Sequence, residues 1–177
     1  PIIRRVAARG GVIVIPAFAI GRAQALMLHI SRLRERKEIP RVPVYLNSPM
    51  AINATRHYHA HHSEHHVSEE DCQRMFDVAT FVNTVEESKA LNRQRGPMII
   101  ISASGMITGG RVLHHIEAFG PDDRNAILLA GYQAGGTRGA ALAAGKPSLR
   151  MFGREVPIRA AVVQLQGFSG HADAGEL

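Results

Sequence analysis

The chain has 177 residues, of which 45% are hydrophobic and 20% are charged. This composition excludes a disordered chain, and no apolar run approaches the ~18 residues that a membrane-spanning helix needs. The length suits one domain with a sizeable core. A formal net charge of +6 predicts attraction to polyanions such as RNA or DNA, although many basic domains bind neither.

The beginning of the chain and its cysteine content bear on compartment. Residues 1–16 combine arginines with a short apolar run but lack the small-residue cleavage site of a signal peptide. Because the chain starts at Pro1, we expect a fragment of a longer protein. The single cysteine, Cys72, cannot form an internal disulfide, which is typical of a reducing compartment. We therefore expect a cytoplasmic protein with no membrane association.

Strand-like and helix-like segments alternate along the chain. Short apolar, β-branched runs predict strands buried on both faces at 12–17, 42–47, 97–103, 125–130 and 160–166. Helical patterns occupy 21–38, 68–81 and 109–120, and Ser68 is the expected N-cap of the second. The adjacent His114 and His115 point apart on the third helix, so one is expected to be packed and one exposed. The alternation predicts an α/β fold with a mainly parallel sheet and flanking helices, ending in hairpin-like strands at 154–173.

Four predicted strands are followed by suggestive loops at 16–24, 47–51, 102–111 and 131–139, and the last two of these loops each contain a glycine pair. In parallel sheets such loops meet at the carboxyl ends of the strands, and glycine-rich turns with arginine suit phosphate. The candidate RNA- or phosphate-binding residues are Arg22, Arg111, Arg138 and Ser104. A structural alternative stays open, because Arg22 and Arg111 can instead pin their helices to the sheet.

A histidine-rich stretch, HYHAHHSEHH, occupies residues 57–66. Its spacing His57-x-His59-x-His61-His62 imitates the HxHxDH metal motif, but His61 stands where that motif has an aspartate. The preceding residues favour the start of a helix over a loop at a strand end. We therefore expect a solvated helix that binds nickel or zinc adventitiously at most, and no specific metal ligand in this chain.

Three polar side chains, Ser169, His171 and Asp173, follow the last predicted strand. A histidine titrates near neutral pH, so His171 can donate or accept a proton. Asp173 can orient that ring or cap a helix. The segment lacks the G-x-S-x-G pattern of a nucleophile elbow, which favours Ser169 as a hydroxyl donor to a phosphate oxygen rather than as a nucleophile.

Five motifs occur in order along the chain, namely PAFAIGRAQALM, NSPMA, SASGMITGGRVLHH, GYQAGGTRGAAL and FSGHAD. Together they resemble the β-CASP branch of the metallo-β-lactamase superfamily, whose members are RNA-processing and in some cases DNA-processing nucleases. The resemblance is greatest to RNA-type members similar to the cleavage and polyadenylation nuclease. It implies a Rossmann-like β-CASP domain at 1–154, inserted as a lid into a metallo-β-lactamase domain to which 155–177 begins the return.

The same resemblance implies an activity. The parent protein would be a ribonuclease in which two zinc ions activate the attacking water. His171 matches the histidine of the family's SxHAD motif, a general acid or phosphate ligand, and Ser169 matches the accompanying serine that contacts the phosphate. The zinc ligands are expected on other parts of the parent chain, so this fragment alone is expected to be inactive. Asn47 departs from the aspartate usual in relatives and cannot supply a negative charge.

Alternatives to this function remain at the level of sequence. The parent could be a non-catalytic nucleic-acid-binding or scaffolding member of the same family, or a nuclease directed at DNA. Phosphate contacts do not distinguish the two sugars, so the sequence does not separate RNA from DNA. The expected partners are RNA, the metallo-β-lactamase domain of the same chain, and in a homodimer a second copy.

Overall fold

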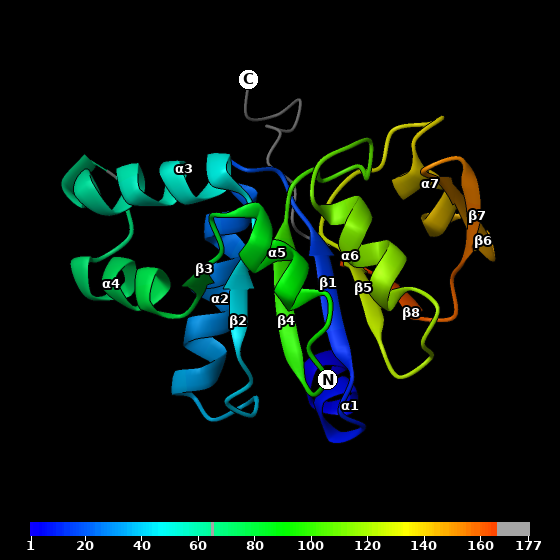
Figure 1. Cartoon of the computed structure of the whole chain (residues 1–177). Coiled ribbons are helices and arrows are strands. Elements are labelled where there is room, and N and C mark those ends of the chain that lie inside the picture. The colour runs from blue at the N-terminus through cyan, green and yellow to red at the C-terminus, as the bar shows by residue number, and fades with distance from the viewer. Residues whose placement is uncertain (65, 166–177) are drawn as a thin grey trace, which may run out of the picture.

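The structure of the chain is a computed structural model that describes residues 1–64 and 66–165 (Figure 1). Its helices are α1 (Ile2–Ala8), α2 (Arg22–Glu35), α3 (Pro49–Ala60), the 3-10 helix η1 (His62–Glu64), α4 (Glu69–Asp77), α5 (Val85–Leu91), α6 (Val112–Phe119) and α7 (Arg138–Ala143). Its strands are β1 (Val12–Pro16), β2 (Val44–Leu46), β3 (Thr80–Phe81), β4 (Met98–Ser102), β5 (Ala126–Leu129), β6 (Ser148–Met151), β7 (Arg154–Pro157) and β8 (Ala161–Gln164).

Six strands form one sheet in the order β3-β2-β4-β1-β5-β8, and all neighbouring pairs are parallel. In the central strand β1, Val14 pairs with Ile100 of β4 and with Ile127 of β5. Parallel neighbours need crossover connections, and the intervening helices supply them. The predicted α/β fold with a mainly parallel sheet is confirmed, and each of the five predicted strand segments contains an observed strand.

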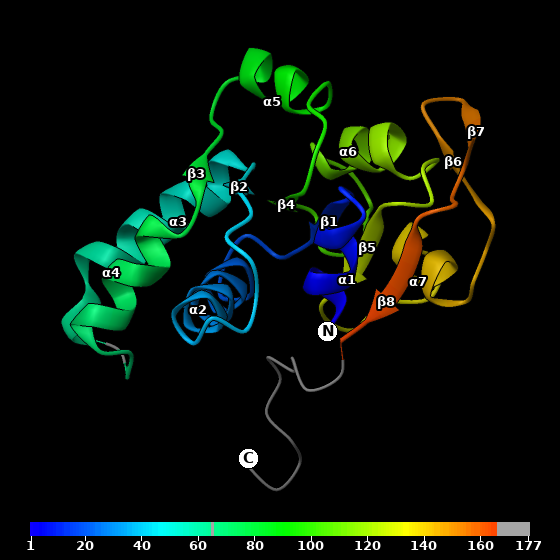
Figure 2. The ribbon, with the colours of Figure 1, turned by 90° about the horizontal axis from the view of Figure 1, so that it is seen from below.

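The central strands are buried on both faces, as their continuous apolar runs predict. Ile13 and Ile15 belong to the core that includes side chains of α1, α2, α3 and α4, whereas Val12 and Val14 belong to the core under α5, α6, α7 and the β6–β7 hairpin. Figure 2 shows these helices on opposite sides of the sheet. Because both faces are covered, polar side chains that can meet a ligand gather at the strand ends.

Residues 68–81 form a shorter helix than predicted. Ser68 is the N-cap, and its side chain accepts a hydrogen bond from the backbone N–H of Asp71, as expected. The helix α4 ends at Asp77, however, and residues 80–81 pair with β2 as β3. The prediction of helix to residue 81 was wrong because pairing with the edge of the sheet overrides local helix propensity.

Three short helices were not predicted, namely α1, α5 and α7. Each is six or seven residues long, too short for an apolar stripe to repeat along it. A cue for α5 existed: Thr84 and Glu87 form a capping box in which each side chain bonds the backbone of the other.

The end of the described chain differs from the predicted hairpin. The hairpin consists of β6 and β7, so its first strand lies upstream of residue 154. Strand β8 instead extends the main sheet, pairing parallel with β5 so that Ile127 faces Val162. The domain boundary at residue 154 stays a prediction.

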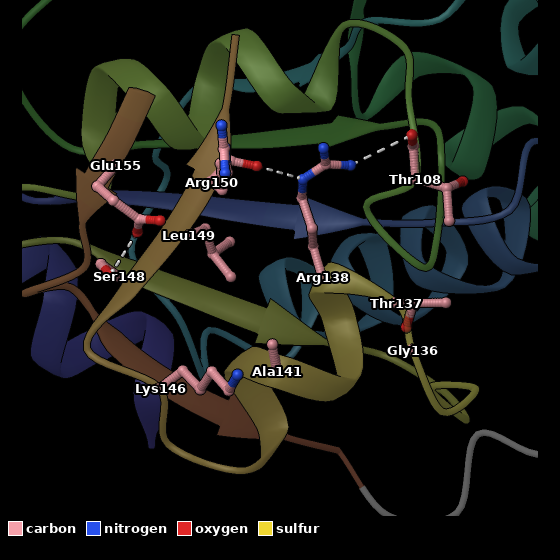
Figure 3. Close-up of a pocket in the computed structure, with 10 residues that line it drawn as sticks. All are labelled: Thr108, Gly136, Thr137, Arg138, Ala141, Lys146, Ser148, Leu149, Arg150 and Glu155. Carbon is pink, nitrogen blue, oxygen red and sulfur yellow. Dashed lines mark hydrogen bonds between the residues drawn. The ribbon is translucent and has the colours of Figure 1, made fainter. Parts of the chain in front are cut away.

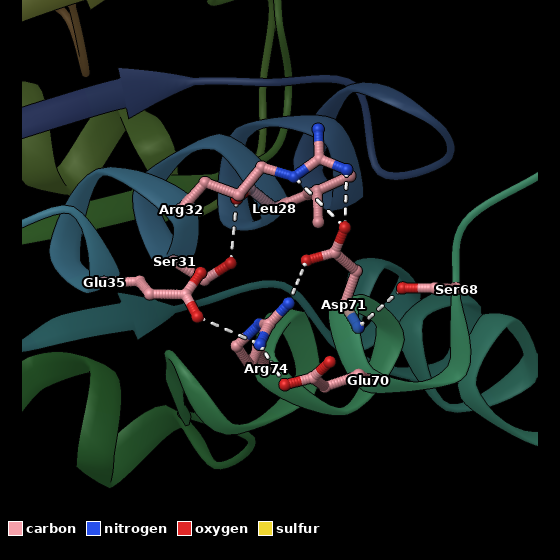
Figure 4. Close-up of polar contacts among 8 residues, drawn as sticks. All are labelled: Leu28, Ser31, Arg32, Glu35, Ser68, Glu70, Asp71 and Arg74. Atoms are coloured by element: carbon pink, nitrogen blue, oxygen red, sulfur yellow. Dashed lines mark hydrogen bonds and ion pairs between the residues drawn. The ribbon is translucent and has the colours of Figure 1, made fainter.

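An ion-pair cluster joins α2 to α4 (Figure 4). The carboxylate of Asp71 bonds Arg32 at 2.6 Å and Arg74 at 2.8 Å, and Arg74 also reaches Glu35 at 3.0 Å. Only 14% of the Asp71 side chain is exposed. Hydrogen bonds from Arg32 and then Arg74 lower the pKa of Asp71 below its ordinary value. The cluster therefore holds the two helices together more firmly than an exposed pair would.

Candidate nucleic-acid interface

The strands β1 and β4 are neighbours whose following helices cover opposite faces of the sheet. The chain leaves β1 through residues 17–21 into α2, and leaves β4 through residues 103–111 into α6. Both loops lie at the carboxyl end of the sheet, at the top of Figure 1. In open α/β sheets, ligands bind outside the carboxyl ends of the strands where the connections diverge in this way.

The loops after β1, β4 and β5 contact one another there. A side-chain carbon at Gly105 would lie 3.0 Å from Phe18, so the first two loops are in close contact. The side-chain amide of Gln133 donates a hydrogen bond to the carbonyl of Gly105 over 3.2 Å, which adds the third loop. These three loops form one continuous surface, which we call the carboxyl edge.

Arg22 lies on the carboxyl edge. It is the first residue of α2, after Gly21, whose φ of 76° lies in the left-handed region that glycine adopts readily. The half-buried guanidinium lies beside Gly131, where a side-chain carbon would be 3.7 Å from Nη2. The structure thus brings Arg22 to the loops after β1 and β5, and its role as a phosphate ligand stays a prediction.

Ser104 lies in the loop between β4 and α6. Its hydroxyl is 3.0 Å from the hydroxyl of Thr108 and accepts the backbone N–H of Thr108 over 3.1 Å. The loop needs glycine at Gly110, where φ is 77° and an added side-chain carbon would lie 2.7 Å from the carbonyl oxygen of Ala103. This hydroxyl pair therefore sits on a loop of defined shape beside Gly105.

Arg111 points away from the three loops, toward β2 and β3. Its Nη1 donates to the side-chain oxygen of Asn47 over 2.8 Å and to the carbonyl of Val82 over 3.2 Å, and its Nη2 donates to the carbonyl of Asn83 over 2.8 Å. This is the geometry of the structural alternative, in which the arginine pins α6 to the sheet. Phosphate binding by Arg111 stays a prediction.

Asn47 and His115 continue this network into the core. Both are fully buried, and Asn47 also donates to the hydroxyl of Ser88 over 2.8 Å. His114 is exposed and stacks on Phe152 with ring centroids 4.5 Å apart. The prediction that one of the adjacent histidines is packed and the other exposed is confirmed.

Arg138 lies on the other side of the carboxyl edge, at the start of α7. Its Nε donates to the carbonyl of Arg150 in β6 over 2.9 Å, and its Nη1 makes longer contacts with the carbonyls of Ile107 and Thr108. The four candidate residues thus do not form one cluster: Arg22 and Ser104 lie on the central loops, and Arg111 and Arg138 flank them.

Exposed apolar side chains on this edge and in the first turn of α3 were not predicted. Phe18, Ile20 and Tyr132 lie in the loops after β1 and β5, and Met50 lies in the first turn of α3; each is between 48% and 73% exposed. The signal was present in the sequence as apolar letters inside turn segments, AFAIG and GYQ. Exposed aromatic rings beside cations can stack on the bases of single-stranded RNA, and exposed apolar patches can also bind protein.

The histidine-rich stretch is mainly helical, as predicted. His57 stacks on His61 with centroids 6.4 Å apart, and His59 stacks on Phe76 of α4 at 4.5 Å. His61 also lies 3.0 Å from the carboxylate of Glu64. Across residues 1–64 and 66–165, no three His, Cys, Asp or Glu side chains are arranged to hold a metal ion. The described residues therefore do not fit the zinc ions that the resemblance implies.

The predicted catalytic cluster of Ser169, His171 and Asp173 lies outside the described residues. Its roles stay predictions.

A family model described as the Beta-Casp domain matches residues 23–142, which is more than half of the chain. The chain belongs to the Beta-Casp family. No helix in the described part of this Beta-Casp chain is long and apolar enough to span a membrane.

Curated relatives of the Beta-Casp chain come from bacteria and archaea. It is 39% identical to "Ribonuclease TTHA0252" of Thermus thermophilus over 99% of the chain and 42% of that protein. It is 32% identical to "Transcription termination factor FttA" of Methanosarcina mazei over 99% of the chain and 29% of that protein. It is 34% identical to "RNase J-like protein" of Methanocaldococcus jannaschii over 95% of the chain and 39% of that protein. The chain thus spans less than half of the length of these relatives.

Proposed function

We propose that this Beta-Casp chain is the RNA-binding lid of a zinc-dependent ribonuclease whose metal site lies outside the described residues. The observation that carries the proposal is the 39% identity, along 99% of the chain, to a protein named as a ribonuclease. The geometry supports it, because a cation, a hydroxyl pair and exposed aromatic rings share the carboxyl edge. These are the groups that a single-stranded polyanion with stacking bases requires.

In this proposal, Arg22 and Ser104 hold a backbone phosphate at the carboxyl edge. His171 protonates the leaving oxygen or steadies the phosphate, Asp173 orients its ring, and Ser169 donates a hydrogen bond to a phosphate oxygen. Since the described residues do not fit a zinc ion, no step here depends on one. Zinc dependence is a property proposed for the protein as it is encoded in full.

Cleavage of labelled single-stranded RNA by the protein as encoded in full tests the proposal. We expect cleavage that a chelator abolishes and zinc restores. Replacing a general acid typically lowers the rate roughly 100- to 10,000-fold, so His171→Ala should lower the rate of RNA cleavage by a factor in that range while RNA binding is retained. Residues 1–177 alone should bind RNA without cleaving it. Robust zinc-dependent cleavage by purified residues 1–177 would contradict the proposal that these residues bind RNA but do not hold the metal site.

A second candidate is a nucleic-acid-binding factor without nuclease activity. The observation that favours this candidate is the similarity, at 32% identity over 99% of the chain, to a protein named transcription termination factor. RNA binding with no cleavage under any metal condition would support this candidate over the ribonuclease. Competition between RNA and DNA oligonucleotides of matched sequence decides whether the substrate is RNA or DNA, since phosphate contacts alone do not read the sugar.

A further inference from the structure

A pocket of about 590 Å³ lies between α7 and the β6–β7 hairpin (Figure 3). Its lining residues come from α7 and the turns on either side of it, from the hairpin, and from the β4–α6 loop: Thr108, Gly136, Thr137, Arg138, Ala141, Lys146, Ser148, Leu149, Arg150 and Glu155. No aromatic side chain is among them. We propose that this pocket, with Arg138, Lys146 and Arg150 as its cations, binds a phosphate group of the RNA backbone.

The charge of the pocket favours an anion. It has three cations and one carboxylate, and the carboxylate of Glu155 already accepts a hydrogen bond from the Ser148 hydroxyl over 2.7 Å. Within residues 1–64 and 66–165, none of the three cations lies within 4.0 Å of a carboxylate oxygen. Three cations against one carboxylate leave the pocket with a net positive charge, which a phosphate would offset.

Arg138 is held in place before any ligand arrives. Its bonds to the carbonyls of Arg150, Ile107 and Thr108 use Nε and Nη1 and tie the guanidinium across the pocket wall. A guanidinium fixed in this way loses little conformational freedom when it binds an anion. Lys146 and Arg150, by contrast, are exposed, and their cationic ends can adjust to a phosphate.

The hairpin lines the pocket with the polar residues Ser148, Arg150 and Glu155 and with the apolar Leu149. Leu149, Met151 and Val156 are buried in the core, whereas Arg150 faces outward opposite its cross-strand partner Glu155. This alternation places Arg150 on the exposed face of the hairpin, opposite the buried side chains. The hairpin therefore carries one of the three cations on its exposed face.

The pocket adjoins the carboxyl edge through Thr108. The hydroxyl of Thr108 is 3.0 Å from that of Ser104, and its backbone contacts Arg138. An RNA strand held at Ser104 thus passes the pocket with an adjacent part of its backbone. Since no lining side chain can stack on a base, the pocket should hold sugar and phosphate without regard to sequence.

This inference rests on the proposed RNA function and is tested with the protein as encoded in full. The variant is Lys146→Gln with Arg150→Gln, and the matched control is Arg5→Gln with Arg41→Gln, which removes the same charge from exposed positions at the amino ends of the strands. Binding of a labelled oligouridylate of roughly 15 nucleotides is measured by fluorescence anisotropy across a salt series. Thermal melting of both variants verifies that they fold.

Loss of the phosphate contact in the pocket should lower the slope of log affinity against log salt by about 0.7 and weaken binding roughly 5-fold near 0.1 M salt. The control pair should change the slope by less than about 0.3. Equal changes of slope in both variants, or no change in the pocket variant, would overturn the assignment of a phosphate to the pocket while leaving the proposed RNA binding intact.

Three further results separate the possible failures. A wild-type protein that binds no RNA overturns the proposed function, and the assignment of RNA to the pocket falls with it. Binding of inorganic phosphate alone, seen as a shift of the Arg138 Nε–H resonance without RNA binding, assigns the pocket to free phosphate instead. Polyglutamate that displaces RNA at equal charge concentration, and loses this ability in the pocket variant, assigns it to an acidic protein segment.

Discussion

The side-chain amide of Asn47 donates a hydrogen bond to Nε2 of His115 over 2.7 Å. Arg111, which can only donate, occupies the side-chain oxygen of Asn47, so the nitrogen of that amide must face the ring. Nε2 is therefore an acceptor, and the ring proton lies on Nδ1, which is 2.5 Å from the side-chain oxygen of Asn92. Burial, followed by the charges of His114 and Arg111, lowers the pKa of His115 to about 4. The network holds this histidine neutral.

Replacing Asn47 with aspartate should raise the pKa of His115. A carboxylate at position 47 would stay ionised beside Arg111 and would accept a hydrogen bond from a protonated Nε2. Because this stabilises the charged imidazole, the pKa of His115 should rise by roughly 2 units. Side-chain NMR of the imidazole nitrogens measures this directly. Ser88→Ala, which leaves the ring contact in place, is the control. A pKa of His115 that stays near 4 in Asn47→Asp would show that burial alone decides it.

The same histidine should make stability depend on pH. In the unfolded chain a histidine titrates near 6.5, whereas in the folded protein the pKa of His115 is about 4. The unfolded state therefore binds the proton first, and the free energy of unfolding should fall as pH drops from about 6.5 to about 4, by up to ~3 kcal/mol. Urea unfolding of wild type against His115→Gln isolates this contribution. His114→Gln, at an exposed position, should retain the dependence.

The ion-pair cluster between α2 and α4 should contribute measurably to stability. Asp71→Asn removes the charge shared by Arg32 and Arg74, and should lower the free energy of unfolding by about 1 to 2 kcal/mol. Glu70→Gln removes a neighbouring carboxylate that is 78% exposed, and should cost less than about 0.5 kcal/mol. Because folding lowers the pKa of Asp71, the contribution of Asp71 to stability should be present at neutral pH. It should disappear as the pH falls below the pKa of a free aspartate. Equal losses in the two variants would refute this role.

Arg111 should behave as a structural residue when both the stability and the RNA binding of a variant are measured. Its three hydrogen bonds tie α6 to the loops after β2 and β3, so Arg111→Gln should lower the free energy of unfolding by roughly 2 kcal/mol. The salt dependence of RNA binding should be unchanged, since a lost phosphate contact would reduce the slope by about 0.7. An unaltered stability together with a flatter salt dependence would instead make Arg111 a phosphate ligand.

The sequence predicted where some of the candidate binding residues lie, because these residues follow the ends of strands. Glycine and arginine after apolar runs placed Arg22 and Ser104 correctly at the carboxyl ends of β1 and β4, because a parallel sheet brings all such ends to one side. The exposure of Phe18 and Tyr132 was not predictable, because an apolar residue in a loop does not reveal whether the folded chain covers it.

Sequence by itself determined the parallel α/β architecture, since the period of its apolar runs and the alternation of strand and helix are local properties that both faces of the sheet then bury. Only the tertiary structure decided the directions of individual side chains. Arg111 turned toward Asn47 and Arg138 toward the hairpin because carbonyls distant in sequence came within hydrogen-bonding reach of each guanidinium. Those partners are brought together by packing, which no local pattern of residues encodes.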